Sequence, residues 1–341
     1  MNRKHFISSL IPLSVSLQKP TSRPSVMTDI SAKYISPPYL KRGDIVGITC
    51  PAGYIMNTEI QPAVNKLREW GYNVRIGQTV NKKDFGFGGT DDERLQDFQQ
   101  QLDDPSVKAI LCARGGYGAI RIIDKIDFTH FKKSPKWIVG FSDITVLHSH
   151  INSNFNIASI HSKMCNSFPE DWQTSELIQQ QTIDSINKCL SGEKISYSFS
   201  ASIQNKRGNG SGQLVGGNLK TIETLAGSAS DLVTKNRILF VEDIGEYLYS
   251  IDRMFWNLAR SGKLKNLNGL VVGGFKVKPD DEGEEFGRTL EQIVLERTAA
   301  FKYPVCFNFP VGHQKNNFAL KCNIQHSLSV QEGGCSLSEI R

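Results

Sequence analysis

Residues 136–148 read KWIVGFSDITVLH, in which an apolar run meets a sharp polar turn and then an amphipathic stretch. The apolar residues of KWIVGF (136–141) predict a buried strand, and SDITVLHSHINSNF (142–155) predicts a helix that follows at once. Ser142 lies at the corner between them. A buried strand that runs directly into a helix is typical of α/β folds.

The same alternation precedes this corner. GDIVGITCPAG (43–53) predicts a strand that ends in a Pro/Gly turn, and residues 59–77 predict a helix, a glycine stop and a second strand. Residues 90–127 predict an aspartate-capped helix, the strand KAILCA, a glycine-rich loop and another helix. We therefore expect the fold class α/β, with a flavodoxin-like or Rossmann-like N-terminal domain that has helices on both faces of a parallel sheet. Ligands bind such sheets beyond the carboxyl ends of the strands.

A change in composition predicts a second domain. From about Thr174 the chain becomes polar and rich in serine and glycine, and later segments alternate between short strands and helices. We expect an N-terminal domain over 36–190, a linker over 191–212, and a smaller C-terminal mixed α+β domain over 213–341. Residues 1–35 are expected to be a disordered extension.

The extension has some features of a signal peptide. MNRKHFISSLIPLSVSLQKP (1–20) has a cationic start and a short apolar run, but serines dilute the run and no A-x-A cleavage site follows. Met27 would open an ordinary N-terminus, so the alternative explanation of residues 1–26 is translation from an upstream start site. We expect a cytoplasmic protein, with periplasmic export as the less favoured alternative.

The bulk composition narrows the function classes. The 341 residues include 39% hydrophobic and 22% charged residues, which predicts a packed globular protein. The net charge is +6, but the lysines and arginines are scattered and form no basic stripe, so nucleic acid is not an expected partner. No apolar stretch is long enough for a membrane span. Seven widely spaced cysteines without a C-x-x-C pair argue against a zinc site or a disulfide framework and favour a reducing compartment.

The corner at Ser142 has two chemical interpretations. A strand-to-helix turn exposes a serine hydroxyl, and the N–H of the next residue, Asp143, could hold an oxyanion. The alternative is that Ser142 or Asp143 merely caps the helix. The α/β-hydrolase motif G-x-S-x-G is not met, because Ile144 replaces the second glycine. The loop ARGGYGA (113–119) follows the preceding strand, so it is either a tight turn or a second source of oxyanion donors.

A nucleophilic serine also needs a base and an acid that orients the base. Candidate histidines are His161, at the expected end of another strand, and His313 in the loop FPVGHQKNN. The strand RILFVED (237–243) delivers Glu242 and Asp243 at its end. Carboxylates that end a buried strand are either solvated caps or rigidly positioned functional groups.

Five separated blocks then carry a family resemblance. In the order ARGGYGAIRIID (113–124), GFSDITVLH (140–148), GQLVGGNLKTI (212–222), LFVEDIGEYLYSIDRMFWNL (239–258) and PVGH (310–313), the chain resembles the LD-carboxypeptidase family, serine peptidase family S66. The resemblance extends from about Pro37 to Val330. The residues SKM after His161 depart from the glycine-proline-like pair that the family pattern leads us to expect there.

The resemblance implies a catalytic triad: Ser142 as the nucleophile, His313 as the general base and Glu242 as the acid that orients it. It also implies an oxyanion hole made by the N–H of Asp143 and of Gly115 or Gly116. Glu246 is the competing acid, ranked lower because it lies in a turn beyond the strand. The site would then assemble between the two domains.

The resemblance further implies a cofactor-free and metal-free serine carboxypeptidase that forms a homodimer. Its substrate would be a murein tetrapeptide, from which it would release D-alanine by hydrolysis of an L,D-peptide bond during peptidoglycan recycling. One alternative is an immunity-type hydrolase that cleaves an aminoacyl or peptidyl adenylate antibiotic, with a nucleobase pocket drawn from Trp137, Tyr247, Tyr249 and Trp256. A second alternative is a non-catalytic ligand-binding module, which would not need Ser142, Glu242 and His313 together.

Overall fold

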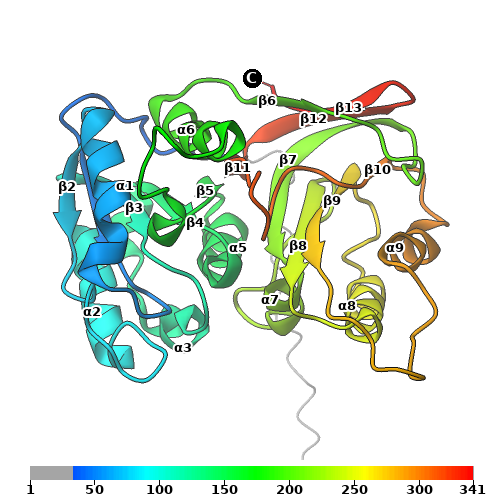
Figure 1. Ribbon diagram of the computed structural model, residues 1–341, viewed down its shortest axis with the longest axis horizontal. Helices are drawn as coiled ribbons and strands as arrows, with labels where there is room; N and C mark the ends of the chain where they lie inside the picture. The colour runs from blue at the N-terminus through cyan, green and yellow to red at the C-terminus, as the bar shows by residue number, and fades with distance from the viewer. Residues whose placement is uncertain (1–33, 341) are drawn as a thin grey trace, which may run out of the picture. The chain divides into compact units, whose positions relative to one another are not determined.

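A computed structural model describes residues 34–340 of the chain, and these residues form two β-sheets with helices packed against them (Figure 1). The signal-like segment 1–20 and Met27 lie outside the described residues. Ile35, which we assigned to the extension, forms a β-bridge with Ile157. Ile35 therefore belongs to the fold rather than to the extension.

The first sheet has the strand order β11-β5-β4-β3-β1-β2. Its parallel strands are β1 (Ile45–Thr49), β2 (Asn73–Ile76), β3 (Val107–Cys112), β4 (Trp137–Gly140) and β5 (Ser159–His161). Apolar side chains of α1 (Asn57–Glu69) and α6 (Leu177–Ser191) cover one face of this sheet. The other face is covered by α2 (Asp91–Asp103), α3 (Ala119–Ile122), α4 (Thr129–Lys133) and α5 (Thr145–Phe155).

The start of α2 illustrates how local sequence fixes these helices. The hydroxyl of Thr90 accepts a hydrogen bond from the backbone N–H of Glu93, and the Glu93 side chain bonds back to the Thr90 N–H. The cap is thus Thr90, and the aspartates that we expected to cap the helix lie in its first turn instead. There their charge interacts favourably with the helix dipole.

The second sheet has the strand order β10-β9-β8-β7-β12-β13-β6. Strands β7 (Gly208–Asn218), β8 (Ile238–Ile244), β9 (Gly269–Lys276) and β10 (Val305–Cys306) are parallel neighbours. Strands β12 (Gln325–Gln331), β13 (Gly334–Glu339) and β6 (Ser196–Phe199) extend the sheet in antiparallel pairs. Helices α7 (Leu219–Thr224), α8 (Leu248–Arg260) and α9 (Leu290–Thr298) pack on one face. The expected fold class, a parallel-sheet domain followed by a mixed domain, is confirmed.

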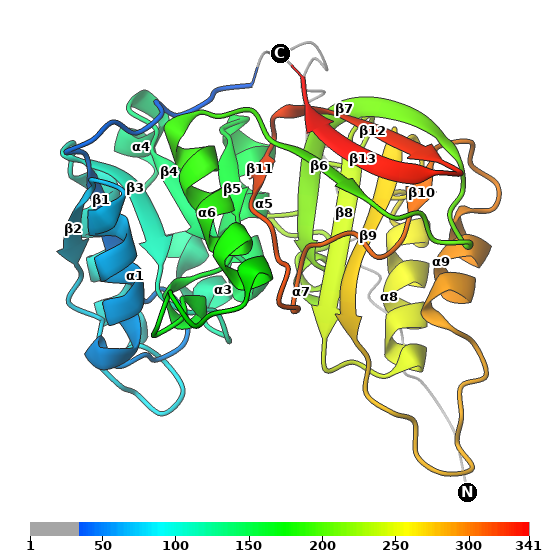
Figure 2. The same cartoon turned by 45° about the horizontal axis from the view of Figure 1, so that its top comes forward.

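Two segments belong to sheets to which the sequence analysis did not assign them. Residues 191–212, expected as a linker, contain β6 and the first part of β7, because Tyr197 and Phe199 pack against the apolar core. The short strand β11 (Leu320–Cys322) comes from the C-terminal part of the chain, yet it pairs antiparallel with β5 of the first sheet. Figure 2 shows β11 beside β5, in the space between the two sheets.

One hydrophobic cluster joins the two sheets. It contains Ala158, Ile160 and Leu320 from the first sheet together with Leu214 and Phe240 from the second, all fully buried. Burial of apolar surface contributes about 25 cal/mol per Å², so a core shared by two sheets resists their separation. The relative position of the two domains is therefore set by packing rather than by a flexible connection.

A close backbone approach adds to this packing. The N–H of Asn218, at the end of β7, donates a 3.0 Å hydrogen bond to the hydroxyl of Thr145 at the start of α5. The preceding Gly217 has φ +143°, and a Cβ atom there would lie 2.4 Å from the Thr145 Oγ1 atom. Only glycine permits both the conformation and the contact. The helix that follows Ser142 thus docks directly on a strand of the second domain.

Replacing Gly217 by alanine should therefore destabilise the fold through a clash as well as through backbone strain. Gly227→Ala is the matched control, because Gly227 also has a positive φ of +79° but has no atom within 4 Å of the place that an alanine Cβ would take. We expect Gly227→Ala to lower the free energy of unfolding by about 1 kcal/mol, and Gly217→Ala by at least about 3 kcal/mol. Urea unfolding measures both, and equal losses would contradict the close approach.

Candidate active site

Ser142 occupies a strained turn between β4 and α5. Its φ is +61°, a left-handed conformation that costs a non-glycine residue about 1–3 kcal/mol and that persists where the surrounding structure enforces it. The turn continues as a 3₁₀ segment, Ser142–Ile144, before α5 begins. Gly140 lets the turn fold back tightly, since a Cβ there would lie 2.9 Å from the Ile144 side chain. This geometry is typical of an exposed nucleophile at the end of a strand.

Asp143 fastens the turn to the glycine-rich loop. Its Oδ2 atom accepts a 2.7 Å hydrogen bond from the backbone N–H of Ala119, the last residue of that loop and the first of α3. The carboxyl group is only 7% exposed, and this burial raises its pKa to about 6, while the Ala119 N–H and the charge of Arg94 act in the opposite direction. The Asp143 side chain therefore has a structural partner, and its backbone N–H lies next to Ser142.

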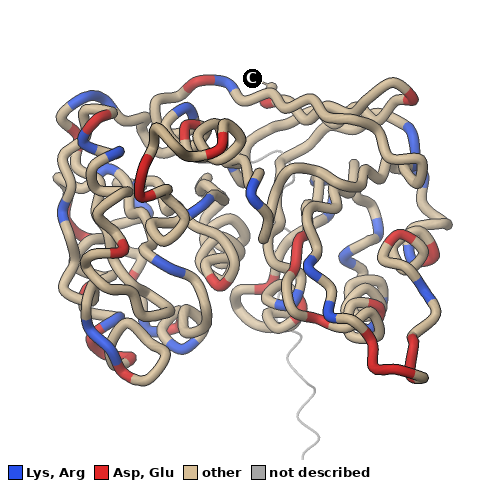
Figure 3. The backbone as a smooth tube through the Cα atoms, in the orientation of Figure 1, with Lys and Arg blue, Asp and Glu red and all other residues tan. Residues whose placement is uncertain are grey.

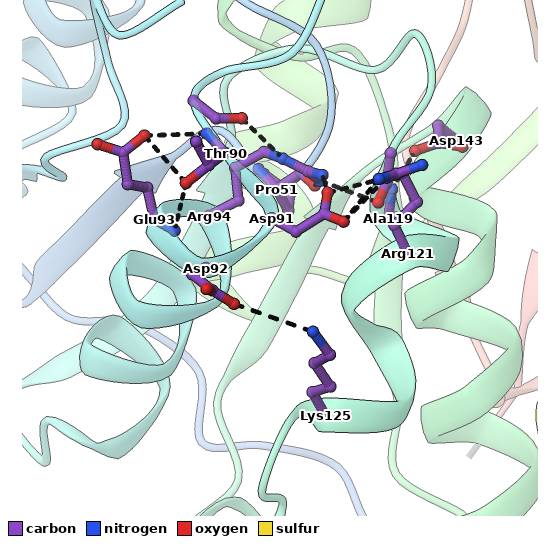
Figure 4. A network of polar contacts seen from close by, with 12 residues as sticks. Pro51, Thr90, Asp91, Asp92, Glu93, Arg94, Ala119, Arg121, Lys125 and Asp143 are labelled. Carbon is purple, nitrogen blue, oxygen red and sulfur yellow. Dashed lines mark hydrogen bonds and ion pairs between the residues drawn. The ribbon is translucent and has the colours of Figure 1, made fainter. Parts of the chain in front are cut away.

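A buried arginine holds the glycine-rich loop from the other side (Figure 4). Arg94 is fully buried, and its Nη1 atom donates to the carbonyl oxygens of Pro51 at 2.6 Å and Gly118 at 2.9 Å. Asp91 binds the same guanidinium and also accepts from Arg121, which lies on α3 beyond the loop. The loop that follows β3 is therefore fixed by charge-assisted hydrogen bonds at its end.

The two candidate glycines of the loop have different neighbours. A Cβ at Gly115 would lie 3.2 Å from the Ser142 Cβ atom and 3.2 Å from the Met164 Cε atom, so Gly115 lies directly against the serine. Gly116 has φ +94° and its nearest neighbour is the Gly53 backbone. The Gly115 carbonyl also accepts a 2.8 Å hydrogen bond from the Gly53 N–H. The loop backbone is thus both close to Ser142 and anchored.

The acid and the histidine come from the second domain. Glu242 Oε2, at the end of β8, lies 2.6 Å from His313 Nδ1. The Glu242 side chain has no exposed surface, and its Oε1 atom has no hydrogen-bond partner among residues 34–340. An ionised carboxylate can only accept, so the neutral imidazole carries its proton on Nδ1 and keeps the lone pair on Nε2. The pair therefore prepares a histidine that can accept a proton.

Close packing of the loop makes this hydrogen bond possible. Gly312 has φ +104°, and a Cβ there would lie 2.5 Å from the Glu242 Cβ atom. The Gly312 N–H donates a 2.8 Å hydrogen bond to Oδ1 of the fully buried Asn317. The His313 ring lies 4.9 Å from the Phe141 ring, centroid to centroid. Because Phe141 precedes Ser142, the histidine of the second domain lies beside the serine turn of the first.

The competing residues have other partners. Glu246 Oε2 accepts a 2.6 Å hydrogen bond from the Ser250 hydroxyl near the start of α8, away from the histidine pair. Asp243 binds the Asn218 side chain and the Lys220 N–H. His161 is fully buried, and desolvation holds its pKa well below the ordinary value. Among these candidates, the structure brings together the turn at Ser142, the backbone of Gly115 and the Glu242–His313 pair.

Three residues at this site were not expected from the sequence. Phe141 and Asn317 are contacts of the histidine loop, and Lys163 donates from Nζ to the Gln314 carbonyl oxygen at 2.7 Å. The departure SKM after His161 marked the position of Lys163 without indicating its partner.

The structure also describes the cysteines, the charge distribution and the residues that could form a metal site or a membrane span. Within residues 34–340 no group of three or more His, Cys, Asp or Glu side chains is arranged to hold a metal ion, and no helix there has the length and apolarity to cross a bilayer. All seven cysteines are buried and free, and Cys50 and Cys112 lie in the core as expected. Figure 3 shows both signs of charge dispersed over the two domains.

Comparison with known proteins shows the family of the chain. Residues 46–162 match the N-terminal domain of LD-carboxypeptidases, and residues 211–328 match the C-terminal domain. The chain belongs to the LD-carboxypeptidase family. It is thus a member of a family of hydrolases, peptidase family S66.

Three relatives illustrate the range of this LD-carboxypeptidase family. A probable murein peptide carboxypeptidase of Bacillus subtilis is 31% identical over 310 residues, which cover 87% of this chain and 92% of the relative. The crystal structure of a muramoyltetrapeptide carboxypeptidase from Oxalobacter formigenes has a TM-score of 0.77 at 27% identity and covers 87% of this chain and 99% of that one. The microcin C7 self-immunity protein of Escherichia coli is 22% identical and covers 87% of this chain and 94% of that protein.

The buried Asp143 carboxyl should make stability depend on pH. Its pKa of about 6 in the folded state exceeds its ordinary value of 3.8, so its stabilising contribution is fully present below about pH 4 and is lost as the pH rises through 6. We expect the wild type to lose about 2–3 kcal/mol relative to Asp143→Asn between pH 4 and pH 7. Urea unfolding at several pH values measures this difference, and parallel profiles for the two proteins would contradict the burial of a titrating carboxyl.

Proposed function

We propose that this chain is a serine-type LD-carboxypeptidase that hydrolyses an L,D-peptide bond and releases the terminal D-amino acid, D-alanine, from murein tetrapeptides in peptidoglycan recycling. The observation that carries the proposal is the 2.6 Å hydrogen bond between Glu242 and His313 beside the left-handed turn of Ser142. Membership of the LD-carboxypeptidase family and the murein peptide substrates in the names of two relatives support the substrate class.

In the first half of the proposed reaction, Ser142 Oγ attacks the carbonyl carbon of the scissile bond while His313 Nε2 takes its proton. The backbone N–H of Asp143 and of Gly115 or Gly116 would donate to the oxyanion. The contact of Gly115 with Ser142 supports a donor from this part of the loop. Glu242 remains ionised and stabilises the imidazolium.

The intermediate then collapses to an acyl-enzyme. The C–N bond breaks, and the imidazolium gives its proton to the amine of the departing D-amino acid. Water attacks the ester with His313 again as the base, and the proton returns to Ser142 Oγ as the shortened peptide leaves. The buried carboxylate of Glu242 favours the imidazolium at both stages, because the pair lies in a low-dielectric environment.

An immunity-type hydrolase is the second candidate. The self-immunity relative supports it, and so does a stacked pair of rings, the half-buried Tyr247 and the exposed Tyr249, with centroids 5.7 Å apart. Of the other two aromatic candidates, Trp137 is fully buried, and the guanidinium of Arg297 lies 3.7 Å from the centroid of the Trp256 ring. The cations over Tyr247 and Tyr249, from Lys278 and Arg253, lie farther away, at 5.2 and 5.3 Å. Relative kcat/KM for a murein tetrapeptide and for an aminoacyl sulfamoyl adenosine separates the two candidates. A non-catalytic binding module is the least favoured interpretation for a member of a hydrolase family.

We also propose a cytoplasmic location and a homodimer. Seven buried free thiols suit a reducing compartment. Light scattering of the purified chain tests the dimer.

Ser142→Ala should abolish hydrolysis without unfolding the protein. Loss of the nucleophile of a triad costs about four to six orders of magnitude in kcat. The assay follows conversion of a murein tetrapeptide to the tripeptide and D-alanine by mass spectrometry, with Ser191→Ala, at the exposed end of α6, as the control. If Ser142→Ala kept a tenth of the wild-type rate, Ser142 would not be the nucleophile. If the wild type left the tetrapeptide intact, the proposed substrate would be wrong.

Glu242→Gln and Glu246→Gln distinguish the two acids. The Glu242 change removes the charge that stabilises the imidazolium and permits the wrong histidine tautomer, so kcat should fall about 10³- to 10⁴-fold. Glu246→Gln retains an acceptor for the Ser250 hydroxyl and should change kcat less than about threefold. The reverse order of the two effects would transfer the orienting role to Glu246.

A further inference from the structure

Lys163 holds a charged group at the edge of the candidate active site. It follows β5 in the segment HSKM, where the chain departs from the family pattern. Its Nζ atom donates to the carbonyl oxygen of Gln314, the residue after His313, at 2.7 Å. The same atom lies 5.6 Å from the centroid of the Phe141 ring, and Phe141 precedes Ser142. The ammonium therefore lies between the serine turn and the histidine loop.

The neighbouring residue connects Lys163 to the nucleophile. The Met164 Cε atom would lie 3.2 Å from a Cβ at Gly115, and Gly115 in turn packs against Ser142. The chain at 163–164 thus forms a wall beside the loop that we propose as the source of an oxyanion donor. A peptide whose scissile carbonyl lies at Ser142 would therefore have this wall on one side of the carbonyl.

In the described part of the chain, the positive charge of Lys163 has no carboxylate of its own to balance it. The charged groups that act on it are Lys276, at the end of β9, and Glu242. Glu242 is already bonded to His313, and among residues 34–340 Lys163 forms no ion pair. Burial and the like charge of Lys276 lower the pKa of Lys163 to about 8, against the opposing effect of Glu242. An ammonium has three donors, and the Gln314 carbonyl uses one of them.

We propose that Lys163 binds the terminal carboxylate of the substrate peptide and so restricts cleavage to the last residue of the chain. The inference rests on the proposed carboxypeptidase function and names the group that the site recognises. In a peptide, the terminal carboxylate lies about one residue length, roughly 3.8 Å, beyond the scissile carbonyl. Lys163 contacts Phe141 and Gln314, the residues next to the proposed nucleophile and base, so it lies on the side where a short leaving residue would end. A cation farther from Ser142 would admit longer chains. The carboxylate would also supply the counter-charge that Lys163 lacks.

A positioning role for Lys163 makes a different prediction. The bond from Lys163 to Gln314 ties the histidine loop to the first domain, so loss of this bond alone would slow every substrate equally. Loss of a carboxylate contact would instead slow only substrates that have a free carboxylate. Two matched tetrapeptides, one ending in D-alanine and one in D-alanine amide, separate the two roles.

The experiment compares wild type, Lys163→Met, Lys163→Arg and Lys315→Met on both peptides. Lys315 is the matched control, because it lies in the same loop but already pairs with Glu176 in an exposed ion pair. We expect the wild type to prefer the free acid by about 10- to 100-fold in kcat/KM, mainly through KM. Lys163→Met should remove this preference by raising KM for the acid, Lys163→Arg should retain most of it, and Lys315→Met should resemble the wild type.

The pH dependence gives an independent readout. The preference for the acid should decline as the pH rises through about 8, where Lys163 loses its charge. Lys276→Met should move that decline to higher pH, because it removes a like charge.

The outcomes are distinguishable. If Lys163→Met slows both peptides equally, or if the wild type cleaves acid and amide equally well, the carboxylate site is refuted while the carboxypeptidase function stands. If the wild type cleaves neither peptide, the proposed function itself fails.

Discussion

A carboxylate with no exposed surface requires a partner, and Glu242 finds it in a histidine 71 positions further along the chain. A charge buried without a partner would cost several kcal/mol, so the loop that carries His313 must return to β8. That return explains local features that otherwise have no evident purpose. Gly312 leaves room for the Glu242 side chain, and Asn317 holds the Gly312 N–H so that the loop keeps its shape.

The same loop must also meet the first domain. After His313 the chain continues into β11, which completes the edge of the first sheet beside β5, and then into β12 of the second sheet. The shared core and the contact of Gly217 with Thr145 fix the two sheets against each other. A serine and a histidine from different domains can therefore be held together without a bound ligand, which is the preorganisation that nucleophilic catalysis needs.

Local patterns predicted the features that depend on neighbours in sequence. The strand-turn-helix corner at Ser142, the buried strand before Glu242 and the alternation of strands and helices all follow from short-range periodicity. The pairing of β11 with β5 was not predictable in this way, because three residues carry too little pattern to name a partner that is more than 150 positions away. The strands within 191–212 were obscured by serine and glycine, although Tyr197 and Phe199 face the core.

In the site, too, some features were predicted from local sequence and others depend on the complete fold. Residue types and strand ends suggested Glu242 and His313 as candidates, and the choice of Glu242 over Glu246 came from the family resemblance together with the position of Glu246 in a turn beyond the strand. The structure adds the contacts that no single segment contains: Phe141 against His313, Asn317 under Gly312, and Lys163 on the Gln314 carbonyl. Each joins residues from distant parts of the chain, so each depends on the complete fold.

The central claim is that Ser142 and His313, contributed by different domains, act as one catalytic unit. A double-mutant cycle on the hydrolysis of a murein tetrapeptide tests it most directly, with kcat measured for Ser142→Ala, His313→Ala and the double variant. If the two residues act together, either single change removes nearly the whole effect, and the double variant is within about threefold of the slower single variant. If the two losses multiply instead, the residues act independently, and the account of a shared site between the domains is wrong.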